Sequence, residues 1–169
     1  MKKTTVILPV LLVLAAASCN TTGCLDNQSA IPLAGFRSSA TGTDISVAGL
    51  RISGVGAPGD SALTSGSGSV SQVYLPMRST ARSTSWCFHY TQEGLDDPAL
   101  NDTVTFDYES IPYFASEECG AMYRYMIEHV GTTTHLIDSV VVADSLITNV
   151  EATRIYIYFR TADPEEPQE

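Results

Sequence analysis

A short loop carries the residues that come nearest to catalytic chemistry. Gly59, Asp60 and Ser61 are followed two residues later by Leu63, and a serine in such a loop could act as a nucleophile. A serine hydroxyl attacks only when a histidine takes its proton and a carboxylate orients that histidine. A catalytic role for Ser61 therefore depends on whether the chain supplies these two partners.

The loop resembles the nucleophile motif of a group of serine esterases, in which an Asp-x-x-His pair near the C-terminus completes the triad. None of the three histidines, His89, His129 and His135, has an aspartate three residues before it. The run of threonine, serine and glycine at 64–69 is also a poor start for the helix that such a nucleophile opens. We therefore expect no catalytic residue, with a serine hydrolase at Ser61 as the disfavoured alternative.

A second segment of the chain explains this loop better. Asp60-Ser61 precedes an alternating segment at 72–77, and Asp144-Ser145 precedes another at 155–160, this time without the glycine. Aspartate and serine side chains bond to nearby backbone groups and favour turns. The sequence thus predicts two Asp-Ser turns, each leading into a strand.

Metal binding has little support in the sequence. The acidic segment 93–102 offers carboxylate oxygens, the ligands that calcium prefers, but lacks the alternating spacing of a calcium loop. The three histidines are scattered, and neighbours such as Glu128 and His129 point to opposite faces of a strand. We expect a solvated loop at 93–102, no metal site and no cofactor; the sequence leaves open whether the loop takes up calcium.

The best candidate for partner binding is a stripe of tyrosine and arginine near the C-terminus. In an alternating strand, every second residue of 154–160 points the same way, and tyrosine and arginine are enriched at protein interfaces. The predicted stripe consists of Arg154, Tyr156, Tyr158 and Arg160.

Alternation of apolar and polar residues, the signature of strands, dominates the chain. In segment 103–108, Val104, Phe106 and Tyr108 share one face; in 85–90, Trp86, Phe88 and Tyr90 do. The predicted strands are 31–36, 45–55, 72–77, 85–90, 103–108, 121–130 and 155–160, with 138–147 as a further candidate because its valines favour strand over helix.

These patterns predict an all-β fold: a single antiparallel β-sandwich of about seven or eight strands, for which an immunoglobulin-like arrangement is one possibility. A small β-barrel is the alternative. We assign the sandwich to residues 30–162. The acidic, proline-containing tail at 163–169 is expected to be disordered because it has no apolar anchor.

The N-terminus predicts secretion and lipid attachment. Lys2 and Lys3 precede an apolar run at 6–17 that is too short to span a bilayer, as in a signal peptide. The run ends in Ala16-Ala17-Ser18-Cys19, which resembles a bacterial lipobox. This resemblance implies a signal peptide at 1–18, acylation of Cys19, and a short tether at 19–29.

The residues after Cys19 bear on the destination. The neutral segment 20–23 has no aspartate next to the cysteine and no acidic cluster. By analogy with lipoprotein sorting signals, we expect the outer membrane, with the body facing the periplasm; the cell surface is the alternative.

Charge excludes one class of partner. Removal of 18 of the 169 residues takes away both lysines and leaves seven arginines against nineteen acidic residues, a net charge of −12. Such a body repels phosphate backbones, so nucleic acid is not expected as a partner.

The mature chain has three cysteines besides Cys19, in an oxidising compartment where one disulfide can form. We predict a bond between Cys24, just past the tether, and Cys119, in a polar turn. The bond would close a loop of about a hundred residues and stabilise the fold by several kcal/mol in the chain-entropy treatment. Cys87 lies in an apolar strand pattern and is expected to be a packed, unreactive thiol.

The mature chain as a whole resembles a family of small uncharacterised lipoproteins from Bacteroides and its relatives. The resemblance rests on the lipobox, on segments 24–29, 31–36 and 114–120, on Tyr74-Leu75-Pro76, and on the closing IYIYFRT. It implies a compartment and mildly supports the Cys24–Cys119 bond, because both cysteines lie in the matching segments.

Three functions are compatible with the sequence. The first is a lipid-anchored, periplasm-facing module that docks on an envelope protein. The second is a glycan- or peptide-binding lipoprotein, which needs a cleft lined by tyrosine or by Trp86, a residue that we expect in the core. The third is a hydrolase, which the missing triad disfavours. We expect the first.

Overall fold

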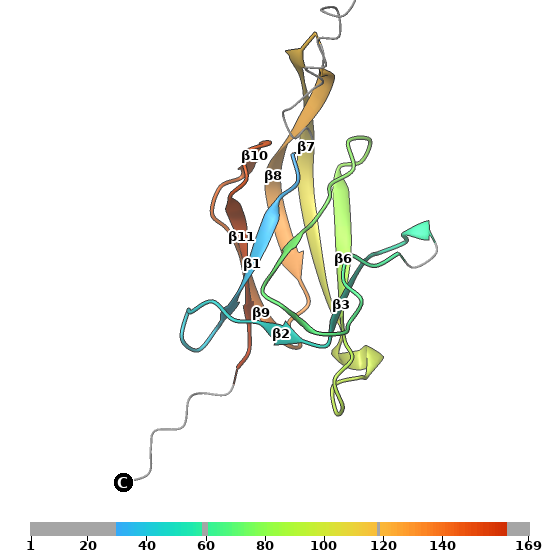
Figure 1. Cartoon of the computed structure of the whole chain (residues 1–169), viewed down its shortest axis with the longest axis vertical. Coiled ribbons are helices and arrows are strands. Elements are labelled where there is room, and N and C mark those ends of the chain that lie inside the picture. Colours follow the sequence, from blue (N-terminus) through green and yellow to red (C-terminus); the bar gives the residue numbers. More distant parts are fainter. Residues whose placement is uncertain (1–29, 59–60, 118, 162–169) are drawn as a thin grey trace, which may run out of the picture.

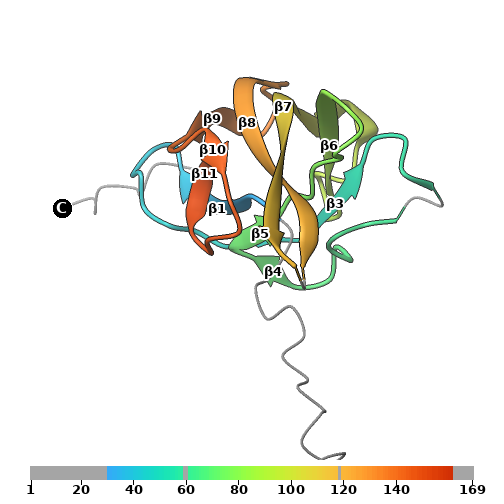
Figure 2. The ribbon, with the colours of Figure 1, turned by 90° about the horizontal axis from the view of Figure 1, so that it is seen from above.

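The computed structural model describes residues 30–58, 61–117 and 119–161, and two stacked β-sheets account for most of them (Figures 1 and 2). One sheet has four strands in the order β5 (Gln72–Tyr74), β1 (Leu33–Ser38), β11 (Thr153–Phe159) and β9 (Ile137–Val142). The other has five, in the order β10 (Leu146–Ile147), β8 (Gly120–Thr132), β7 (Asp102–Ser116), β6 (Ser83–Tyr90) and β3 (Leu50–Gly54).

Smaller elements complete the described part of the chain. Strands β2 (Val47–Ala48) and β4 (Ser69–Val70) pair with each other, and a short 3-10 helix, η2, spans Pro98–Leu100. In the parts of the chain that the structure describes, no helix is long and apolar enough to cross a bilayer.

The predicted β-sandwich is confirmed. The two sheets stay open rather than closing into a barrel, so the alternative architecture is not the one observed. Two details differ from the prediction. The main sheets contain nine strands, because β9 and β10 are separate and belong to different sheets. In addition, β1 and β11 pair in parallel, so the four-stranded sheet is mixed rather than antiparallel.

The core lies between the sheets and follows the predicted alternation. On β11, Ile155, Ile157 and Phe159 are buried, and on β6 the same holds for Trp86, Phe88 and Tyr90. The inward side chains of β1, β3 and β7 meet them, with the rings of Phe36 and Phe159 in edge contact at 5.1 Å. Burial of these apolar side chains is the main favourable contribution to folding.

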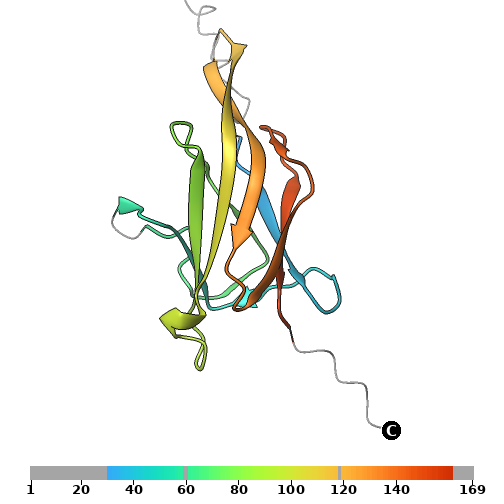
Figure 3. The same ribbon diagram turned by 180° about the vertical axis from the view of Figure 1, so that it is seen from behind.

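Strands β7 and β8 are longer than their neighbours and project from one end of the sandwich (Figures 1 and 3). β6 pairs with β7 only as far as Asp107, so residues 109–116 of β7 pair with β8 alone. We call residues 109–124 the arm. The sequence predicted shorter strands here, at 103–108 and 121–130, and did not predict the arm.

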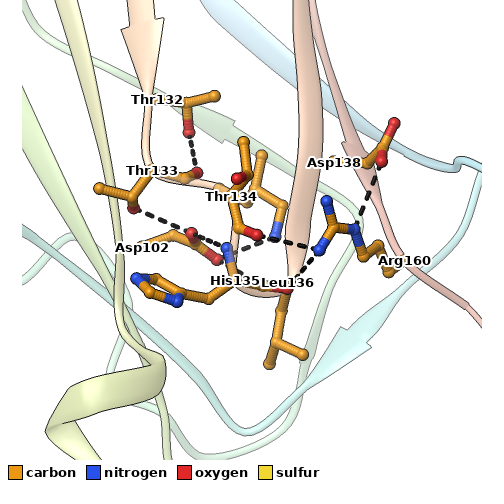
Figure 4. Close-up of polar contacts among 9 residues, drawn as sticks. Asp102, Thr132, Thr133, Thr134, His135, Leu136, Asp138 and Arg160 are labelled. Atoms are coloured by element: carbon orange, nitrogen blue, oxygen red, sulfur yellow. Dashed lines mark hydrogen bonds and ion pairs between the residues drawn. The ribbon is translucent and has the colours of Figure 1, made fainter.

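At the opposite end, the carboxylate of Asp102 binds the segment that carries the chain from β8 in one sheet to β9 in the other (Figure 4). Asp102, the first residue of β7, is fully buried. Its Oδ1 accepts from the N–H of His135 at 2.8 Å and from the Thr133 hydroxyl at 2.9 Å. Its Oδ2 accepts from the N–H groups of Leu136 and Ile137 and from the Tyr90 hydroxyl, each at 2.8 Å.

Arg160 binds the carbonyl oxygens of the same connecting segment. Its guanidinium donates to the carbonyl oxygens of Thr134 at 2.9 Å and His135 at 3.2 Å, and its backbone N–H donates to that of Leu136 at 2.8 Å. Residues 133–136 carry the chain from β8 to β9. The N–H groups of residues 135–137 therefore go to Asp102, and the carbonyls of residues 134–136 go to Arg160. These bonds satisfy polar groups that a buried loop would otherwise leave unpaired.

The buried position of Asp102 contradicts one prediction from the sequence, and it shifts the pKa values of Asp102 and Tyr90. Residues 93–102 were expected to form a solvated loop, yet Asp102 is in the core. Burial by itself would raise the pKa of its carboxyl, but the three backbone N–H donors and Tyr90 outweigh burial and hold that pKa below its ordinary value. Burial and the adjacent negative charge raise the pKa of Tyr90.

Replacing Asp102 by asparagine is expected to lower the free energy of unfolding by about 3 kcal/mol, because one amide cannot accept five hydrogen bonds and its NH2 group would face backbone donors. Urea unfolding of the Asp102→Asn variant measures this. Glu93→Gln is the control, since Glu93 is exposed and makes none of the hydrogen bonds or ion pairs found in the described residues; it should unfold as the wild type does. Equal midpoints for all three proteins would contradict the role given to Asp102.

The same experiment has an expected pH dependence. The pKa of Asp102 is lower in the folded state, so its stabilisation is complete above the unfolded value of about 3.9 and is lost as the pH falls through the folded value. The difference between wild type and Asp102→Asn should thus be largest near neutral pH and shrink below about pH 4.

Candidate functional site

The predicted tyrosine and arginine stripe lies on the outer face of the four-stranded sheet. Because Ile155, Ile157 and Phe159 point inward, Tyr156 and Tyr158 point outward. Across the sheet, these two tyrosines pair with Gly35 and Arg37 of β1 on one side and with Val141 and Ser139 of β9 on the other.

Arg37 organises the centre of this face. Its guanidinium carbon lies 3.8 Å from the centroid of the Tyr156 ring, and its Nε donates to Asp44 at 3.0 Å. A hydrogen bond with Tyr158, followed by the one with Asp44, raises the pKa of Arg37, so the group is a permanent cation. Two tyrosines and an arginine are thereby held in a fixed arrangement on the surface.

Gly35, on the neighbouring strand β1, leaves the space in which the Tyr156 ring lies. A Cβ atom at this position would lie 3.1 Å from Cγ2 of Thr153 and 3.8 Å from the nearest atom of the Tyr156 ring. The absence of a side chain lets the ring lie close to the backbone of the neighbouring strand. The sequence offered no sign of this contact.

The two predicted arginines, Arg154 on β11 and Arg160 directly after it, both form ion pairs within the chain. Arg154 forms an ion pair with Asp144 and is mostly covered. Arg160 pairs with Asp138 at 3.3 Å and holds the β8–β9 connection described above. The charges of both arginines are compensated, although Arg160 stays exposed and Tyr156 and Tyr158 are half-buried. The tyrosines are therefore the groups of the stripe that are not already committed to an ion pair.

Sequence reasoning missed two members of this surface. Tyr74 on β5 is 43% exposed and donates from its hydroxyl to Glu151 at 2.6 Å, a bond that raises the pKa of Tyr74. Val141 on β9 is 46% exposed beside Tyr156. Strand order brings these residues together, because β5 is far from β9 and β11 in sequence and the pairing of β9 with β11 was not predicted. We name Arg37, Tyr74, Val141, Tyr156 and Tyr158 the tyrosine face.

The structure describes the second predicted Asp-Ser turn completely and the first only in part. The carboxylate of Asp144 accepts from the N–H of Leu146 at 3.0 Å, so the predicted turn is confirmed there. Ser61 is exposed, and the next residue, Ala62, bridges to Ser53. Among the hydrogen bonds of the described residues, none joins Ser61 to a histidine. Gly59 and Asp60 lie outside the described residues.

The histidines form separate pairs. His89 Nε2 lies 3.2 Å from Asp96, and His129 Nδ1 lies 3.5 Å from Asp107. Within the described ranges, no three histidine, cysteine, aspartate or glutamate side chains come together in a way that could hold a metal ion. In the acidic loop, the carboxylate of Asp97 caps the short helix η2 by accepting from the N–H of Ala99 at 2.8 Å. This acidic residue therefore stabilises the local backbone.

A second surface feature lies beneath the arm. A cavity of about 570 Å³ opens between the core-facing side of the arm, the loop after β5, and Ala30 at the start of the described chain. Tyr123 and Tyr125 line it from the arm side, and Met77 and Arg78 from the loop. The Tyr108 hydroxyl fixes this loop by accepting from the N–H of Arg78 and donating to its carbonyl, both at 2.9 Å.

The free edge of the arm on the β7 side cannot easily accept another strand. The N–H of Tyr108 points to the β6 side of β7 and donates to the carbonyl oxygen of Arg82, the residue before β6. Backbone groups of every second residue point to the same side of a strand, so the nitrogen of Pro112 also points to this side. Beyond Asp107 this side is not covered by β6, and the nitrogen of Pro112 carries no hydrogen to donate. Proline at such a position is a known protection of sheet edges. A partner strand at this side of the arm would find the row of backbone donors interrupted at Pro112.

Among the predicted cysteine roles, the described residues bear on that of Cys87. Cys87 is a half-buried free thiol, and burial, with a smaller effect of the Asp102 charge, raises its pKa. It is therefore a poor nucleophile. Cys119 lines the cavity near Ala30. Cys19 and Cys24 lie outside the described residues, so the lipid attachment and the Cys24–Cys119 bond stay predictions.

The chain belongs to a family of proteins of unknown function, DUF6452, whose family model matches residues 49–159. The match runs from just before β3 to the end of β11. No curated protein and no solved structure gives a match. Membership of an uncharacterised family is thus confirmed, whereas the lipoprotein class and the Bacteroides origin stay predictions.

We expect the purified mature protein to contain one disulfide and one free thiol. Without reduction, unfolded protein should react with maleimide only at Cys87, and peptide mapping should recover Cys24 linked to Cys119. Cys119→Ser should make Cys24 reactive and leave Cys87 unchanged. Maleimide on Cys24 or Cys119 in the unreduced wild type would contradict the pairing.

Proposed function

We propose that this protein is a lipid-anchored protein of the bacterial cell envelope that works as an interaction module. In this proposal the acylated residue is Cys19, the membrane is the outer membrane, and the body faces the periplasm. The tyrosine face is the surface that docks on an envelope protein, and the protein performs no catalysis of its own.

The tyrosine face is the single observation that carries the proposal. It combines partly exposed tyrosines with a fixed arginine, the residue types enriched among the side chains that contribute most of the binding energy in protein interfaces, and it adds an exposed valine. The ordering of these side chains in the free protein lowers the entropy that binding would cost.

Charge compensation on the same surface favours a protein partner. Arg37, Arg154 and Arg160 each pair with an aspartate, so the face is not strongly acidic although the mature chain carries a net charge of −12. An apolar and aromatic centre with a paired, polar rim is the usual anatomy of a protein-binding patch.

The alternative, binding of a glycan or peptide, would use the cavity beneath the arm rather than Trp86. Trp86, the aromatic residue best suited to stack on a sugar, is 7% exposed and packs in the core as predicted. The cavity beneath the arm, with Tyr123 and Tyr125 in its lining, is then the site where such a ligand would sit.

Site-specific photo-crosslinking in the native host tests the proposal. A benzoylphenylalanine residue replaces Val141 on the tyrosine face, and the matched control replaces Val55, which is 53% exposed on the loop after β3. We expect one dominant envelope adduct from position 141, none from position 55, and loss of the adduct in a Cys19→Ala background. Identical adducts from both positions, or adducts indifferent to Cys19, would contradict the proposal.

A further inference from the structure

Exposed apolar side chains gather at the end of the sandwich that carries the arm. The two most exposed large apolar residues of the described chain are Phe114, at 69%, and Val150, at 62%. Phe114 is on β7 near the tip of the arm, and Val150 is in the loop that precedes β11 at the same end (Figures 1 and 3). Tyr123, at 41%, stands on the core-facing side of the arm.

The arm exposes these groups because the facing sheet is shorter. Phe114 and Tyr123 continue the inward face of β7 and β8, the face that holds Tyr108 and Ile127 in the core. Beyond Tyr125 no strand of the four-stranded sheet covers them. An apolar surface of this kind that stays uncovered in a stable fold marks a contact with a partner or a membrane.

The charges of this end differ from those of the rest of the molecule. Arg78 and Arg82 are exposed and have no carboxylate partner among the ion pairs of the described residues, while Arg124 lies over the Tyr113 ring at 4.1 Å. Their described acidic neighbours are Glu109, Glu117 and Glu151, so the described residues of this end balance in charge. Glu118, the next residue in the sequence after Glu117, adds one further negative charge. The acidic loop with Glu93, Asp96 and Asp97 lies at the other end of the sandwich.

The chain also enters the fold at the arm. Ala30, the first described residue, lines the cavity together with Cys119 and Tyr123. Cys19 precedes it by eleven residues, which reach at most about 40 Å when fully extended. With the predicted Cys24–Cys119 bond, only five residues separate the acylated cysteine from the arm, a reach of about 18 Å.

We propose that the arm end rests on the phospholipid bilayer. Phe114 and Val150 enter the headgroup region, Tyr123 lies at its edge, and Arg78 and Arg82 lie at the level of the phosphates. Aromatic side chains favour this region, and arginine places its stem along apolar surface with its charge in the polar layer. The carboxylate of Glu117 would be costly to bury in the apolar layer, so the contact is limited to the headgroup region. This inference rests on the lipid anchor of the proposed function and adds the orientation of the body.

Quenching by brominated lipid tests the contact. The full-length lipidated protein is reconstituted in vesicles of phosphatidylethanolamine and phosphatidylglycerol, 3:1, with or without bromine on the acyl chains. The variant carries Phe114→Trp, and the matched control carries Val55→Trp, on an exposed loop away from the arm. Trp86 is buried in both and gives the same background.

We expect at least about twofold stronger quenching at position 114 than at position 55, with a blue shift of the emission at position 114 only. Flotation of the vesicles separates the two claims. Protein that floats but shows no selective quenching at position 114 overturns the orientation and leaves the anchor standing, and the arm is then free for a protein partner. Protein that does not float overturns the anchor, and the orientation with it.

Discussion

The sandwich depends on a buried carboxylate that receives five hydrogen bonds. Asp102 begins the longest strand of one sheet and binds the three consecutive N–H groups of residues 135–137, where the chain passes to the other sheet. An unpaired charge at this depth would be very costly, and five donors within 2.9 Å make it stable. With Arg160 on the carbonyl side, this contact fixes where β9 begins and hence the position of β11, which pairs with β9 and presents the tyrosines.

The molecule has two different ends and one ordered side. The end held by Asp102 carries the acidic loop. The end with the arm carries exposed aromatic residues and two exposed arginines, Arg78 and Arg82, that form no ion pair with another described residue. Between them, the outer face of the four-stranded sheet presents Tyr156 and Tyr158 with Arg37 in a fixed position. A body tethered near the arm would turn this side face, rather than either end, toward proteins along the membrane.

Strand positions could be predicted because alternation is a local property. Every residue that was predicted to point inward on β6 and β11 does so, because each of these strands has one buried face and one more exposed face. The parallel pairing of β1 with β11 and the length of the arm could not be predicted, because both depend on which strands become neighbours. For the same reason Tyr74 and Val141 were missed as members of the tyrosine face.

The polar contacts were the least predictable feature. Asp102 was placed in a solvated acidic loop because its neighbours in sequence are acidic, and three of its five donors are backbone N–H groups more than thirty residues away, which leave no mark in the sequence. Arg154 and Arg160 looked available for a partner because their aspartates, Asp144 and Asp138, lie on a different strand or turn. The turn at Asp144, by contrast, was predicted because its acceptor and donor are two residues apart.

The proposed docking role and the proposed orientation both require the lipid anchor, and the intact mass of the protein extracted from its native membrane tests for that anchor directly. The predicted result is a chain that begins at Cys19 and carries the added mass of a diacylglyceryl group, with or without a third acyl chain. A chain that begins at another residue, or one that begins at Cys19 without lipid, would contradict a membrane-anchored module and the orientation derived from it.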